Sequence, residues 1–257
     1  MTTLYDIDGN AIDLYPSAYK NKTLSILGDS ISTFAGYIPS GNANYYTGSN
    51  CGVTSVNDTW WKKLMDALGM TLNLNQSWSG SRVTTTNGET SAGCMTRCQT
   101  LGTNPDVIIV YMGINDFNNE VGLGTYDGNG TFPTETTTFR EAYAILLNKL
   151  MTAYPLAEIW CATLPPCEKN GGIGAPEKNG NSVLLDDFNK AIRNLAQVFN
   201  AKILENAQCG LYYHNMSTYM GDWNSSASTA LHPNASGHSL IANWAIRQMD
   251  ASCPTRY

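Results

Sequence analysis

The segment Asp-Val-Ile-Ile-Val-Tyr-Met-Gly at residues 106–113 is the feature that most restricts the fold of this chain. A continuous apolar run rich in β-branched residues is typical of a central strand in a parallel sheet, where both faces of the strand are buried. Four other short, largely apolar segments have the length of strands and lie at residues 24–27, 70–75, 158–165 and 201–204. The chain therefore predicts a parallel sheet of five strands.

Helical patterns lie between these segments and after the last one. The expected helices cover residues 59–68, a stretch that opens near 138, a stretch from about 182 to 199, and residues 236–249. Strands and helices that alternate in this way predict a doubly wound, flavodoxin-like α/β fold with helices on both faces of the sheet. With no internal repeat or low-complexity linker, we expect one domain over residues 1–257, in which residues 1–22 form an N-terminal extension.

Polar residues at the start of three of these helices are candidate N-caps. Asp58 precedes the first helix and Ser182 precedes the third. Thr138-Phe-Arg-Glu141 has the spacing of a capping box, in which the two side chains bond to each other's backbone N–H groups. We expect these residues to begin their helices.

The charge of the chain argues against nucleic-acid and anionic-membrane partners. The net charge is −6, from 15 basic and 21 acidic residues, and there is no basic run. Charged residues make up 14% of the chain, against roughly 25% in an average globular protein. Asn, Thr, Ser, Gly and Tyr take their place, a composition that favours a protein working outside the cell or at its surface.

The sequence offers no targeting or membrane segment that would explain such a location. Residues 1–23 lack the apolar core of a signal peptide. No segment has the 18 or more consecutive apolar residues that a membrane span needs, counted as roughly one residue per 1.5 Å of bilayer. We expect a soluble chain whose export would need a leader from elsewhere or another route.

The seven cysteines are an odd number and are not spaced like metal ligands. Cys94 and Cys98 form a C-x3-C pair, whereas Cys161 and Cys167 bracket a Pro-Pro turn. A zinc site would favour closer C-x2-C pairs or a Cys/His cluster, so we expect no metal. We expect some disulfides and at least one free buried thiol, in a pairing that the sequence does not determine.

Ligand sites of doubly wound sheets lie beyond the carboxyl ends of the strands. The loop after residues 24–27 holds Gly28-Asp29-Ser30, a tight turn that can expose a serine beside free backbone N–H groups. The next loops hold Gly80 and Asn115, and the loop before the last helix holds His232. Taken singly, each motif is better explained as a turn, a flexible loop or a helix cap.

Together, these four loops supply a serine, a backbone donor, an amide donor and a histidine to one edge of the sheet. In this combination the sequence resembles the SGNH hydrolase (GDSL esterase/lipase) superfamily, and its longer stretches resemble a bacterial, carbohydrate-esterase-like subgroup. The blocks that carry the resemblance are ILGDS, NQSWSGS, Gly113-x-Asn115-Asp116 and LHPNASGH, in the family's order.

The resemblance implies a serine esterase without cofactor or metal. Ser30 would attack the ester carbonyl while His232 accepts its proton. The N–H groups of Ser30 and Gly80 and the side-chain amide of Asn115 would form the oxyanion hole. Asp29 and Asp116 are expected to brace their loops rather than react.

One departure from the family concerns the acid that usually orients the histidine. The last family block is usually Asp-x-x-His, but Thr229 stands three residues before His232. A hydroxyl of Thr229 or Ser228, or a backbone carbonyl, could orient the imidazole in a Ser–His dyad. Asp222 could instead serve as a remote acid, or the site could bind without catalysis. Because the serine, the oxyanion donors and the histidine are all retained, we favour a catalytic site over one that only binds, and we favour the dyad over the remote acid.

Tryptophans near these loops suggest the substrate. Trp60, Trp78 and Trp223 could stack on sugar rings, although core packing explains tryptophans equally well, especially in the Trp60-Trp61 pair. The expected function is hydrolysis of short-chain, in particular acetyl, esters of carbohydrate. The alternatives are a thioesterase or general small-ester hydrolase, and a non-catalytic glycan-binding module on the same scaffold.

Overall fold

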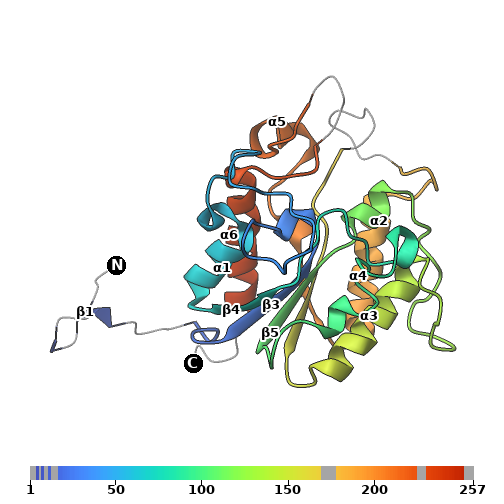
Figure 1. Cartoon of the computed structure of the whole chain (residues 1–257), viewed down its shortest axis with the longest axis horizontal. Coiled ribbons are helices and arrows are strands. Elements are labelled where there is room, and N and C mark those ends of the chain that lie inside the picture. The colour runs from blue at the N-terminus through green and yellow to red at the C-terminus, as the bar shows by residue number, and fades with distance from the viewer. Residues whose placement is uncertain are drawn as a thin grey trace.

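The computed structural model of the chain describes residues 4–5, 7–8, 11–12, 17–168, 178–224 and 230–251. Its centre is a parallel sheet with the strand order β4-β3-β5-β6-β7 (Figure 1). The strands are β3 (Thr23–Gly28), β4 (Thr71–Asn75), β5 (Val107–Tyr111), β6 (Glu158–Ala162) and β7 (Lys202–Leu204). The predicted five-stranded, doubly wound α/β fold is confirmed.

Helices cover both faces of this sheet. On one face lie α1 (Trp60–Leu68) and α6 (Ala235–Ala251), which pack together, and on the other lie α3 (Phe139–Ala153) and α4 (Leu185–Val198) (Figure 1). The connections contain α2 (Ile114–Asn118), α5 (Met216–Tyr219) and the 3-10 turns η1 (Ser30–Ser32), η2 (Val56–Asp58), η3 (Thr85–Asn87), η4 (Arg97–Gln99), η5 (Asn206–Gln208) and η6 (Tyr213–Asn215).

Within the predicted N-terminal extension, β1 (Leu4–Tyr5) and β2 (Ala11–Ile12) form an antiparallel pair that the sequence did not lead us to expect. Across the described part of the chain, no helix combines the length and the apolar character that crossing a membrane requires.

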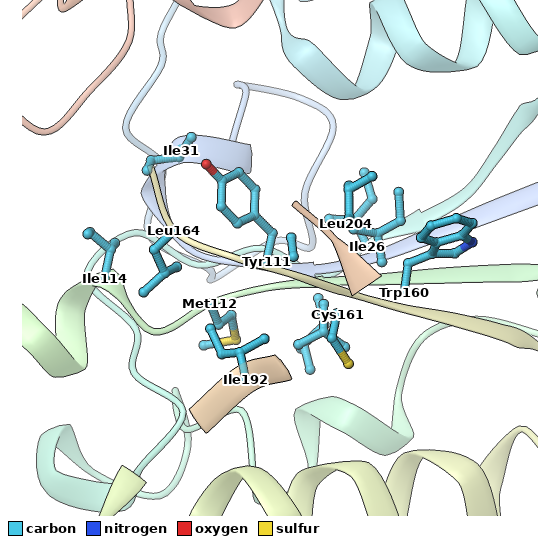
Figure 2. Close-up of a cluster of buried hydrophobic side chains, with 14 of the residues drawn as sticks. Ile26, Ile31, Tyr111, Met112, Ile114, Trp160, Cys161, Leu164, Ile192 and Leu204 are labelled. Carbon is cyan, nitrogen blue, oxygen red and sulfur yellow. The ribbon is translucent and has the colours of Figure 1, made fainter. Parts of the chain in front are cut away.

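The central strands bury side chains on both faces of the sheet, as their apolar sequences predict. Tyr111 and Trp160 point to one face, whereas Met112 and Cys161 point to the other, where Ile192 of α4 meets them (Figure 2). All five side chains are buried, and so is every residue of β5. The sheet is therefore a rigid platform that presents its connecting loops at fixed positions.

The helix starts differ from the expected caps, because other hydrogen bonds compete for the capping side chains. Helix α1 is capped by Thr59, while the carboxylate of Asp58 accepts the N–H groups of residues 54 and 55 and closes the preceding turn. Helix α4 begins after Leu184 rather than Ser182, which lies in a turn with a φ of 61°. The predicted caps at Asp58 and Ser182 are therefore wrong.

Thr138 does precede α3, but it forms no capping box. Its hydroxyl donates to Glu141 Oε2 at 2.8 Å, and Glu141 Oε1 accepts the N–H groups of Thr125 and Tyr126 at 2.8 and 3.0 Å. Glu141 thus fastens the preceding loop to the helix instead of capping it.

The expected disulfides are not present among the described cysteines. Six of them are free thiols: Cys51, Cys94, Cys98, Cys161, Cys167 and Cys209. All except Cys51 are buried, and the fold uses them as small apolar side chains. Cys253 lies outside the described residues.

Replacement of Ile192 by alanine should lower the free energy of unfolding by about 2–5 kcal/mol, since it opens a cavity between α4 and the sheet. Alanine favours helices, so a lower free energy of unfolding would result from lost packing and not from helix propensity. Urea denaturation measures it, with Leu156→Ala as the control, because that side chain is 97% exposed. Equal stability of the two variants would contradict the assignment of this core.

Candidate active site

Ser30 lies directly beyond the carboxyl end of β3, in the first turn of η1. The turn is closed by Asp29, whose Oδ1 accepts the N–H of Ile31 at 3.0 Å. It also needs a glycine at position 28, since an added Cβ would lie 2.5 Å from Ser77 Oγ and 2.7 Å from Ser32 Cβ. The loop after β4 therefore packs directly against the turn that carries Ser30.

His232 reaches this serine from the loop before α6. Its Nε2 lies 2.9 Å from Ser30 Oγ, although 202 positions separate the two residues in the sequence. The loop joins the helix through Asn234, whose Oδ1 accepts the N–H groups of Ser236 and Gly237, both at 3.0 Å. The imidazole is therefore placed to take a proton from the serine hydroxyl.

Asp222 stands on the other side of the imidazole. Its Oδ2 lies 2.7 Å from His232 Nδ1, while Oδ1 accepts the N–H groups of Leu231 and His232 at 3.0 and 2.9 Å. Burial alone would raise the pKa of Asp222, but its hydrogen bonds and the charge of His232 outweigh burial and lower that pKa below its usual value. The carboxylate therefore stays ionised beside the imidazole.

This arrangement matches the remote-acid alternative, in which Asp222 serves as the acid, and not the favoured dyad without a carboxylate. Sequence spacing could not reveal the partner, because Asp222 precedes His232 by ten positions instead of three. The chain folds back through a bridge between Met220 and Pro233, and Gly221 N–H donates to His232 O at 2.8 Å. Thr229 and Ser228 lie outside the described residues.

Three donors expected in an oxyanion hole come from the loops at this edge. Gly80 follows β4 with a φ of 76°, and an added Cβ would meet only open space. Asn115 is buried in the first turn of α2, where its Nδ2 donates to Ser81 O at 3.0 Å. Among the described residues, no acceptor takes the N–H of Ser30 or of Gly80.

Asp116 holds in place the loop after β4, which carries Gly80. Its carboxylate accepts the N–H groups of Val83 and Thr84 at 2.8 and 3.1 Å and the Thr84 hydroxyl at 2.8 Å. Burial raises the pKa of Asp116 to about 6, despite these hydrogen bonds. Asp29 bonds within its own turn, whereas Asp116, at the start of α2, bonds to the loop after β4, so each carboxylate holds a loop.

Arg97 is a component of the site region that the sequence did not single out. Its buried guanidinium donates through Nη2 to Gly28 O at 2.8 Å and Gln76 O at 2.5 Å, and through Nη1 to Ser91 O at 2.5 Å. It therefore ties together the loops that follow β3 and β4. A lone arginine in Thr-Arg-Cys-Gln carries no local signal of this role.

The tryptophans divide between core and surface. Trp60 is 0% exposed, with its indole N–H bonded to Ser32 Oγ at 3.2 Å and its ring against Tyr111, so the prediction that it contacts substrate is wrong. Trp78 is half-buried after β4, and Trp223 is 37% exposed beside Asp222. Of the residues predicted to stack on sugars, only Trp78 and Trp223 have exposed surface that a ligand could contact.

The described residues contain no group of three or more His, Cys, Asp and Glu side chains that could hold a metal ion.

Asp29→Asn tests how burial acts on the acid next to Ser30. Burial raises the pKa of Asp29 to about 7, so the folded protein holds this proton more tightly than the unfolded chain does. Asp29 therefore stabilises the fold at low pH and loses that contribution as pH rises from about 4 to 7. Urea denaturation at pH 4.5 and 7.5 should show the variant gaining stability relative to the wild type at the higher pH. A pH-independent difference would contradict the raised pKa.

Comparison with known proteins identifies the family of the chain. The family model for GDSL-like lipase/acylhydrolase matches residues 22–166, which is more than half of the chain. No curated protein matches.

Solved structures show the same fold over nearly the whole chain. A GDSL-like lipase from Bacteroides ovatus is 28% identical with a TM-score of 0.69, covering 91% of this chain and 100% of its own. Another from Bacteroides uniformis is 27% identical with a TM-score of 0.65, covering 89% and 95%. An acetylxylan esterase from Geobacillus stearothermophilus is 18% identical with a TM-score of 0.55, covering 91% and 95%, and shares the fold. The chain belongs to the GDSL-like lipase/acylhydrolase family and is a hydrolase of carboxylic esters.

Proposed function

We propose that this protein hydrolyses short-chain, chiefly acetyl, esters of carbohydrate by nucleophilic catalysis at Ser30. The observation that carries the proposal is the continuous line Ser30–His232–Asp222, with contacts of 2.9 and 2.7 Å. Nucleophile, base and orienting acid in this order are the arrangement of serine hydrolases on several unrelated folds.

The first step is the attack of Ser30 Oγ on the ester carbonyl carbon. As the C–O bond forms, the hydroxyl proton passes to His232 Nε2, and Asp222 stabilises the resulting imidazolium through Nδ1–H. The carbonyl oxygen becomes an oxyanion, which the Ser30 and Gly80 N–H groups and the Asn115 amide are available to bind. Asn115 would turn from Ser81 O to do so.

The tetrahedral intermediate collapses when the alcohol leaves with the proton held on Nε2. Water then attacks the acyl-enzyme, and His232 accepts its proton in turn, so that Ser30 is released with the free acid. No cofactor enters either half of the reaction, since proton transfer and charge stabilisation suffice.

Two observations support a carbohydrate ester as substrate. Trp223, directly after Asp222 in the chain, is 37% exposed and so has aromatic surface to offer a sugar ring. The acetylxylan esterase with this fold acts on an acetylated glycan by its name. The complete hydrogen-bonded line favours an enzyme over a module that only binds glycan.

Turnover of p-nitrophenyl esters of increasing acyl length tests the reaction. We expect the fastest hydrolysis with acetate, and a loss on the order of 10⁶-fold in kcat for Ser30→Ala, because the nucleophile is removed. Ser49→Ala, at an exposed serine, is the matched control. Turnover by a folded Ser30→Ala variant equal to that of wild type would refute the assignment of the nucleophile.

Asp222→Asn tests the carboxylate. Asparagine keeps an oxygen for the N–H groups of Leu231 and His232, but its neutral amide does not hold the imidazole in the required tautomer. We expect kcat to fall by about 10⁴-fold, as on loss of the acid in a serine protease. Thermal denaturation checks that the variant is folded, and near-normal turnover would return the dyad to favour.

A further inference from the structure

Tyr45 lies face to face with the imidazole of His232. The ring centroids are 3.4 Å apart and the planes differ by 12°, so the two rings overlap almost fully. The phenol ring therefore covers one face of His232, while the Nδ1 and Nε2 edges of the imidazole stay free for Asp222 and Ser30.

This geometry is unusual for two uncharged rings. Neutral aromatic pairs prefer offset or edge-to-face contacts with centroids about 4.5–7 Å apart, because their quadrupoles repel in a centred stack. Neighbouring pairs follow that preference: Tyr45 with Tyr46 at 5.0 Å and 84°, and Tyr46 with His238 at 4.9 Å and 67°. A cation, by contrast, is attracted to the centre of an aromatic face.

We propose that Tyr45 is a positioning residue for the reaction, whose ring keeps the imidazole in the plane that joins Ser30 to Asp222 and stabilises the imidazolium formed when Ser30 Oγ transfers its proton to Nε2. The inference rests on the proposed function. The attraction grows as positive charge develops on His232, so it favours the transition state over the resting enzyme.

The backbone of Tyr45 is tied to the nucleophile. Its N–H donates to Thr33 Oγ1 at 3.0 Å, and the Thr33 hydroxyl donates to Ser30 O at 2.9 Å. The backbone carbonyl of Tyr45 accepts a hydrogen bond from Asn50 Nδ2 at 2.9 Å. The stacking ring is thus held in register with the turn that carries Ser30.

The hydroxyl of Tyr45 connects the ring to the loop of the acid. It lies 3.1 Å from Cys51 Sγ. Cys51 in turn packs against Gly221, where an added Cβ would lie 2.3 Å from Cys51 Cβ, and Gly221 precedes Asp222. Tyr45 is therefore connected both to the turn that carries Ser30 and to the loop that carries Asp222.

Four titratable groups near His232, namely Tyr45, Tyr46, Cys51 and His238, are uncharged at neutral pH. Burial raises the pKa of Tyr45, Tyr46 and Cys51, and burial lowers the pKa of His238 to about 3. Asp222, whose pKa is lowered, is ionised and in contact with the imidazole.

The test compares Tyr45→Leu, Tyr45→Phe and the control Tyr37→Leu. Tyr37 packs against Phe34 and Trp61 and does not touch His232. Leucine covers the imidazole without an aromatic face, so kcat/KM should fall roughly two- to thirty-fold, with the acid limb of its pH profile moved to lower pH. Phenylalanine keeps the face and should restore both, while Tyr37→Leu should match the wild type.

Proton NMR of His232 tests the stack without requiring turnover, and three histidines make assignment simple. In the wild type, the ring current of Tyr45 should move the imidazole C–H signals upfield, and Tyr45→Leu should remove that shift and lower the midpoint of the His232 titration. Tyr45→Phe should keep both.

The outcomes separate the two proposals. A wild type without Ser30-dependent turnover refutes the proposed function, whereas the NMR titration still decides whether Tyr45 stabilises the imidazolium. An unchanged titration midpoint in Tyr45→Leu, or an unchanged pH profile in an active enzyme, refutes the role of Tyr45 alone.

Discussion

The need of buried backbone groups for hydrogen-bond partners shapes this site more than any single catalytic contact does. Where β3 ends, Gly28 O accepts both Arg97 Nη2 and the N–H of Trp78. The Ser30 carbonyl is bonded by the Thr33 hydroxyl. The N–H groups of Ser30 and Gly80 have no acceptor among the described residues, and in the proposed reaction they bind the oxyanion.

The surroundings of Asp29, Asp116 and Asp222, which are buried or half-buried, give these three acids different roles. Asp29 and Asp116 lie where burial dominates, so their pKa values rise to about 7 and about 6 while they hold loop N–H groups. Asp222 faces an imidazole and two N–H groups, which together lower its pKa despite burial. The same side chain thus braces a loop in two places and remains an ionised partner of His232 in the third, because only at Asp222 do the hydrogen bonds and the neighbouring charge outweigh burial.

Aromatic residues around the site are similarly divided by position. Trp60 fills the core between α1 and the sheet, where its N–H holds Ser32, while Trp223 keeps an exposed face. Tyr45 is intermediate: it is partly buried, but its face lies on His232 rather than on apolar neighbours. In the proposed reaction, the ring of Tyr45 stabilises a transient cation, whereas the exposed tryptophan offers aromatic surface to the substrate.

The amino-acid sequence by itself determined the parallel sheet, the edge at which the loops meet and the identity of Ser30, Gly80, Asn115 and His232 as candidates. These follow from local patterns, namely apolar runs such as residues 107–111 and short motifs after each strand. Only the tertiary structure decided which acid faces His232, which tryptophans are buried, how Arg97 is used and that the described cysteines are unpaired. Each of these depends on contacts between residues whose separation in the chain has no characteristic spacing, such as the pairing of Met220 with Pro233 that brings Asp222 to the imidazole.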